Sequence, residues 1–82
     1  MGSIDVGVKR TLDMTGYFCP EPVVRTSEEI ETIGVGEALM MIADDPSSVS
    51  DMESWARRTG HELLSVERGG DGVYRFLIRR SG

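Results

Sequence analysis

The most reactive side-chain type in this sequence occurs once, in the segment Cys19-Pro20-Glu21-Pro22. A cysteine thiolate is a nucleophile, and a cysteine at a helix N-terminus can ionise below the free-thiol pKa of ~8.5. Two of the chain's three prolines follow Cys19 closely. Proline is tolerated in the first turn of a helix, where its missing N–H removes no intrahelical hydrogen bond. The segment therefore predicts a thiol held rigidly at a helix start, with Pro20 at the first and Pro22 at the third helical position.

Two features of the same segment oppose a large fall in the pKa of Cys19. The prolines remove backbone N–H donors from the helix start, and Glu21 brings a negative charge close to the sulfur. We therefore expect a moderate shift. The alternative is that Cys19 is a small apolar residue packed at a strand end, as free cysteines often are. Two prolines so close to it favour the reactive thiol.

Other polar residues are weaker candidates for chemistry. A lone cysteine forms no intramolecular disulfide and supplies one soft ligand, and no paired His or Cys spacing is present, so we expect no metal and no cofactor. Asp44-Asp45-Pro46 is more typical of a turn than of an acid–base pair. Nothing in the sequence places His61 beside Cys19. The methionines at 14, 40, 41 and 52, and the tryptophan at 55, are interpreted as core residues.

The hydrophobic pattern predicts the element order β-α-β-α-β-β. The expected elements are a strand at 9–14, a helix at 20–33, a strand at 37–43, a helix that a Ser48–Asp51 capping box starts and Gly60 ends, and two strands at 61–68 and 73–80 that form a hairpin. Short right-handed crossovers place successive helices on the same side of a sheet. The fold class is therefore α+β, a two-layer sandwich with both helices on one face of a mixed four-stranded sheet.

Length and charge exclude several classes of protein. With 82 residues there is room for one domain with a thin core, expected at 9–80 after a disordered N-terminal tail at 1–8. The net charge is -5 and the basic residues are scattered, so we expect no direct nucleic-acid binding. The longest apolar run is far shorter than a membrane span, and the N-terminus has no signal-peptide pattern. A cytoplasmic location with no membrane association is expected.

The segment from Cys19 to Val23 resembles the signature of the TusA/SirA family of small sulfur-carrier proteins. The likeness covers residues 11–80 and includes the segments at 11–13, 43–46 and 60–63. It implies the same sandwich fold. It also implies that Cys19, supported by Pro20, Glu21 and Pro22, accepts sulfane sulfur as a persulfide from a cysteine desulfurase or rhodanese-like donor. The sulfur then passes to an acceptor protein for tRNA thiolation, cofactor biosynthesis or sulfur metabolism. Such a protein is a sulfurtransferase-like carrier, expected to be a monomer, rather than a turnover enzyme.

One departure from the family pattern leaves the partner open. Relatives that serve tRNA thiolation carry basic residues on the first helix, whereas Glu28, Glu29 and Glu31 follow the motif here. Partner recognition by small carriers is expected to depend on charge. Two other functions remain as alternatives: a regulatory or adaptor domain in which Cys19 is incidental, and a one-cysteine redox enzyme, which the lack of a resolving cysteine makes weaker.

Overall fold

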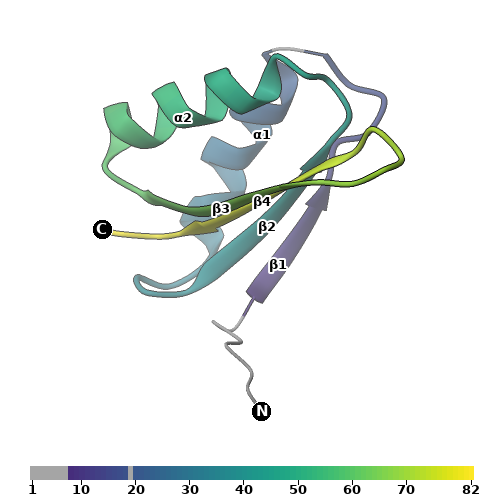
Figure 1. Ribbon diagram of the computed structural model, residues 1–82. Helices are drawn as coiled ribbons and strands as arrows, with labels where there is room; N and C mark the ends of the chain where they lie inside the picture. The colour runs from purple at the N-terminus through teal and green to yellow at the C-terminus, as the bar shows by residue number, and fades with distance from the viewer. Residues whose placement is uncertain (1–7, 19) are drawn as a thin grey trace.

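The computed structural model describes residues 8–18 and 20–82 (Figure 1). Its elements are β1 (Val8–Asp13), α1 (Glu21–Glu29), the short 3-10 helix η1 (Ile30–Thr32), β2 (Ala38–Ala43), α2 (Ser48–Thr59), β3 (Glu62–Arg68) and β4 (Tyr74–Arg79). This order confirms the predicted one. β1 begins at Val8, inside the segment expected to be a tail; the rest of that segment lies outside the described residues.

The four strands form one mixed sheet in the order β1-β2-β4-β3. β1 and β2 are parallel, and the other two neighbouring pairs are antiparallel. Both helices cover the same face of the sheet, which confirms the two-layer α+β sandwich (Figure 1). Because β1 and β2 are parallel, their carboxyl ends meet at one edge of the sheet. The pairing of Ala43 with Tyr74 brings the β3–β4 hairpin loop to that edge too. We call it the carboxyl edge: the loops at 14–18, 44–47 and 69–73.

The core lies between the sheet and the helices. Its fully buried members are drawn from both layers: Met14, Ile30, Ile33, Leu39, Met41, Ala43, Met52, Trp55, Phe76 and Ile78. β2 is the central parallel strand and is the most deeply buried one. Three of the four methionines predicted in the core are there. Met40 is only half-buried, because side chains alternate along a strand and its neighbour Met41 takes the inward position.

Two helix boundaries differ from the predicted ones. α1 ends at Glu29, and the last turn of the expected helix tightens into η1. α2 begins at Ser48 as predicted, but the capping box is absent: Ser47 is the N-cap residue and makes no side-chain cap hydrogen bond. The reason is the preceding turn, in which the Ser48 N–H donates to the Asp45 carbonyl (2.9 Å). Ser48 is therefore already in the first helical turn and cannot cap it.

Trp55 joins the two helices. Its side chain is 1% exposed, and its Nε1–H donates to Ser27 Oγ on α1 (2.6 Å). The ring also packs against His61, with ring centroids 5.4 Å apart. Nδ1 of His61 accepts the Ser81 N–H (3.0 Å), so this histidine ties the C-terminal segment to the end of α2. Trp55 is the anchor of α2, as predicted.

We predict that Ser27→Ala lowers the free energy of unfolding by about 1–3 kcal/mol, because it leaves the buried Trp55 Nε1–H without an acceptor. Urea denaturation of the wild type and the variant measures the difference. Phenylalanine at position 55 has no N–H group. In a Trp55→Phe background, Ser27→Ala should therefore lower the free energy of unfolding by only a few tenths of a kcal/mol. An equal loss in both backgrounds would show that this hydrogen bond contributes nothing specific.

Candidate functional site

Cys19, the predicted nucleophile, lies outside the described residues. The chain on both sides of it is described, and both neighbours, Phe18 and Pro20, are exposed. Phe18 ends the loop that leaves β1, and Pro20 is the N-cap residue of α1. The described residues on either side of Cys19 therefore lie between β1 and α1, at the carboxyl edge (Figure 1).

The two prolines of the motif each lie one position earlier in α1 than predicted. Pro20 is the N-cap residue, with φ −100° and ψ 13°, rather than the first helical residue. The Glu21 N–H donates to the Phe18 carbonyl (2.9 Å), which makes a turn just before the helix. Pro20 is the third residue of that turn, and its carbonyl accepts the Val24 N–H (3.0 Å) to begin the helical pattern. Glu21 is then the first helical residue and Pro22 the second.

The prolines also differ in their surroundings. Pro20 is exposed, whereas Pro22 is among the fully buried side chains. The Pro22 carbonyl accepts the hydroxyl proton of Thr26, a residue with no exposed surface (2.7 Å). Pro22 therefore anchors the first turn of α1 in the core, while Pro20 shapes the surface next to Cys19. From the sequence alone both had the same role, because proline's fixed φ says nothing about which way its ring faces.

The loop before the motif is a tight turn over residues 14–17. The Tyr17 N–H donates to the Met14 carbonyl (3.2 Å), and Gly16 has a φ of 87°, which a side chain would disfavour. Asp13 Oδ1 accepts both the backbone N–H (3.0 Å) and the hydroxyl proton (2.7 Å) of Thr15. These two hydrogen bonds hold the pKa of the Asp13 carboxyl below its ordinary value of 3.8, and the bond from the backbone N–H has the larger effect.

A residue from the second crossover reaches the same turn. The Gly16 N–H donates to both carboxylate oxygens of Asp44, at 3.1 and 3.2 Å. Its neighbour Asp45 accepts the Ser47 N–H (3.1 Å), so the pair does structural work in turns, as interpreted from the sequence. Sequence reasoning did not predict the contact between Asp44 and the loop before Cys19. The parallel pairing of the first two strands could have indicated it, because it brings the loops that follow these strands together.

Exposed apolar side chains flank the motif. Phe18 is 74% exposed and Tyr17 50%, and Val24 on α1 is 42% exposed. Sequence reasoning did not single them out. Tyr17 and Phe18 could have been identified from the sequence, because they precede the cysteine directly and belong to no periodic apolar pattern. Such residues can contact a partner protein at low entropic cost, because an aromatic ring loses few rotamers on binding.

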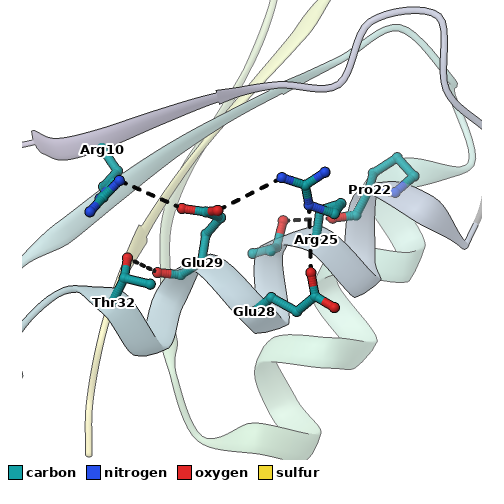
Figure 2. A network of polar contacts seen from close by, with 7 residues as sticks. Arg10, Pro22, Arg25, Glu28, Glu29 and Thr32 are labelled. Atoms are coloured by element: carbon teal, nitrogen blue, oxygen red, sulfur yellow. Dashed lines mark hydrogen bonds and ion pairs between the residues drawn. The ribbon is translucent and has the colours of Figure 1, made fainter.

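The acidic stretch of α1 is partly neutralised by arginines, as Figure 2 shows. Glu29 lies between Arg10 of β1 (4.0 Å) and Arg25 of α1 (3.8 Å). Arg25 also pairs with Glu28 (3.6 Å). The side chain of Glu29 is 25% exposed and that of Glu28 is 65% exposed. The charge presented to a partner is therefore weaker than Glu28, Glu29 and Glu31 suggested in the sequence. It lies mainly on Glu28 of α1 and Glu31 of η1, both of which are exposed.

His61 is not brought to the motif. α2 starts at the carboxyl edge, and its 12 residues carry the chain about 18 Å away before His61 follows. Over residues 8–18 and 20–82 there is no pocket and no cluster of three His, Cys, Asp or Glu side chains that could hold a metal. Within the same ranges, no helix is long and apolar enough to cross a membrane.

Comparison with known proteins agrees with this architecture. The family model described as "Sulfurtransferase TusA" matches residues 10–80. A protein of Halobacterium salinarum is 41% identical over 96% of this chain and 98% of its own length. The sulfur carrier protein TusA of Allochromatium vinosum is 39% identical over 85% of this chain and 91% of its own length.

A solved structure shows the same fold. The crystal structure of a SirA-like protein from Desulfitobacterium hafniense superposes with a TM-score of 0.78, covering 89% of this chain and 99% of that one, at 22% identity. At that identity the likeness concerns the fold alone. The family match extends from β1 through β4 and includes the whole Cys-Pro-Glu-Pro motif. This chain belongs to the TusA family of sulfurtransferases.

Proposed function

We propose that this protein is a sulfur carrier, which accepts a sulfane sulfur on Cys19 as a persulfide and relays it to an acceptor protein. The observation that carries the proposal is the position of the chain's one cysteine, immediately before the N-cap residue of α1, in a sequence that matches the TusA family over residues 10–80. A helix N-terminus favours a negative charge, so it favours the thiolate that the reaction needs.

The transfer step is an exchange between a thiolate and a persulfide. The Cys19 thiolate attacks the terminal sulfur of a donor persulfide, R–S–S–H, and the S–S bond of the donor breaks as a new one forms. The donor leaves as the thiolate R–S⁻, and Cys19 carries –S–S–H. The electron pair of the broken bond goes to the leaving sulfur, so no external oxidant or reductant is needed. Attack by an acceptor thiolate on the carried sulfur repeats the exchange and returns Cys19 to its thiolate.

The residues around Cys19 have supporting roles in this proposal. Pro22, buried beneath the first turn, fixes the helix start, and exposed Pro20 and Glu21 border the surface on which a partner docks. The donor is a cysteine desulfurase or a rhodanese-like protein, and the carrier acts as a monomer in the cytoplasm. The product belongs to tRNA thiolation, cofactor biosynthesis or sulfur metabolism. Delivery passes from protein to protein and not by direct binding to nucleic acid, because the net charge is -5 and the basic residues are scattered along the chain.

We predict that incubation with a cysteine desulfurase, cysteine and pyridoxal phosphate adds one sulfur atom to the wild type and none to Cys19→Ser. The serine variant keeps the size of the side chain but removes the nucleophilic sulfur, so the fold should be unchanged. Intact-protein mass spectrometry measures the added sulfur, and treatment with a reductant should remove it.

Delivery is the second half of the test. The loaded wild type, freed from the desulfurase, should pass its sulfur to a second thiol protein, and the amount delivered should match the amount lost. If Cys19→Ser supports the same delivery in a reconstituted pathway, the cysteine is incidental and the adaptor function replaces the carrier.

We also predict that the charge on the exposed surface of α1 and η1 affects docking and leaves the chemical step unchanged. Replacing exposed Glu28 and Glu31 with lysine should accelerate loading severalfold at low salt by a desulfurase whose usual carrier has a basic first helix. Glu29 is left in place because it pairs with both Arg10 and Arg25. The acceleration should fade between 0.1 and 1 M salt, as the Debye length falls from about 10 to about 3 Å.

The matched control is Glu53→Lys with Glu67→Lys, which changes the net charge equally from α2 and β3, where both residues are exposed. Loading rates are measured by quenching the reaction at timed intervals and weighing the protein by mass spectrometry. The variant at Glu28 and Glu31 should load faster than the control variant. If both accelerate loading equally, net charge alone sets the rate, and the surface of α1 has no special part in docking.

A further inference from the structure

The turn that leads to Cys19 is fastened to a different part of the chain. Asp44 leaves the end of β2 and accepts the Gly16 N–H with both carboxylate oxygens, at 3.1 and 3.2 Å. The two residues are 28 positions apart in the sequence. Hydrogen bonds to an ionised acceptor are roughly twice as strong as those between neutral groups. This contact therefore links the first crossover, which carries the motif, to the second.

Gly16 is the point at which this link matters most. On its N-terminal side, Met14 is 2% exposed and its N–H donates to the Ile42 carbonyl, which extends the pairing of β1 with β2 (2.7 Å). On its C-terminal side, the Phe18 carbonyl accepts the Glu21 N–H of α1. Between these fixed points the chain turns at Gly16, whose φ of 87° is a conformation only glycine adopts freely. The Gly16 peptide group therefore sets the direction of the chain through Tyr17 and Phe18, the two residues before Cys19.

Asp44 is itself held in place from both sides. The preceding residue, Ala43, is fully buried and pairs with Tyr74 of β4. The following residues form the turn that starts α2, closed by the Ser48 N–H on the Asp45 carbonyl. Asp13 is different, because it binds Thr15 two residues away and so fixes only the local turn. Asp44 is the carboxylate that fixes this turn relative to the sheet.

We propose that Asp44 is a positioning residue for the sulfur-transfer step: its carboxylate holds the Gly16 peptide group, and with it exposed Tyr17 and Phe18, so that a protein donor docks beside Cys19 in one orientation. This inference rests on the proposed carrier function. Transfer between two proteins needs a narrow range of attack geometry, and small errors of placement lower such rates strongly. A small reagent that can approach from many directions is less sensitive to that placement.

The test compares four proteins: the wild type, Asp44→Ala, Asp44→Asn and Glu37→Ala. The asparagine keeps one oxygen that can accept the Gly16 N–H while losing the charge, so it separates the hydrogen bond from the electrostatic effect. Glu37→Ala is the matched control. Glu37 also accepts a backbone N–H with its carboxylate, that of Gly34 (2.6 Å), but it does so before β2, at the other end of the sheet.

We expect the rate of sulfur transfer from a persulfidated cysteine desulfurase to fall about tenfold in Asp44→Ala, to recover most of the way in Asp44→Asn, and to stay unchanged in Glu37→Ala. Iodoacetamide labelling of Cys19 at a pH where the thiol is fully ionised should change less than about twofold in all four. If alanine and asparagine slow transfer equally, or neither does, the positioning role is wrong.

Hydrogen exchange at the Gly16 amide gives a readout that does not depend on sulfur. The exchange should be faster in Asp44→Ala than in the wild type and slower again in Asp44→Asn. A wild type that takes up no sulfur overturns the carrier function, whereas unchanged exchange in Asp44→Ala overturns the positioning contact. The two failures are therefore distinguishable.

Discussion

The parallel pairing of β1 with β2 is the constraint on which the rest of the arrangement depends. Two parallel neighbours need a crossover between them, and α1 with η1 supplies it. The same pairing brings the ends of both strands, and hence the starts of both helices, to one edge of the sheet. The chain on either side of Cys19 lies there, and Asp44 accepts the Gly16 N–H there. If β1 and β2 were antiparallel and joined by a tight hairpin, no helix would lie between them, and the loops that follow the two strands would lie at opposite edges of the sheet.

The small core provides few packing contacts to hold the carboxyl edge rigid. One buried proline and two side-chain hydrogen bonds add to them. Pro22 is buried under the start of α1, Thr26 binds its carbonyl, and Trp55 bonds to Ser27 one residue further on. α1 is therefore fixed on its inner face along its length, while Glu28 and Val24 stay exposed on its outer face. A rigid inner face and an exposed outer face are compatible with the proposed role, in which partner proteins dock at the start of α1 beside Cys19.

The order of elements, the fold class and the place of the motif could be predicted from the sequence, because they follow from apolar periodicity and from Pro and Gly positions. The helix boundaries that were predicted wrongly, and the side-chain contacts that were not predicted, depend on tertiary contacts. The exact cap of α2 was decided by the Ser48–Asp45 turn, and the placement of Pro20 by the turn from Phe18 to Glu21. Asp44 has an ordinary turn sequence around it, and only the sheet order reveals its partner. The pairing of Glu29 with Arg10 is likewise invisible until β1 lies beside α1.

The proposed function requires Cys19 to be an accessible and partly activated thiol, and the pH profile of its alkylation in the native protein measures both properties. Iodoacetamide reacts with the thiolate, so the rate follows the ionised fraction. We predict complete labelling without denaturant and a midpoint below the free-thiol pKa of ~8.5. Labelling that occurs only after unfolding would show that Cys19 is a buried packing residue and would contradict the carrier function.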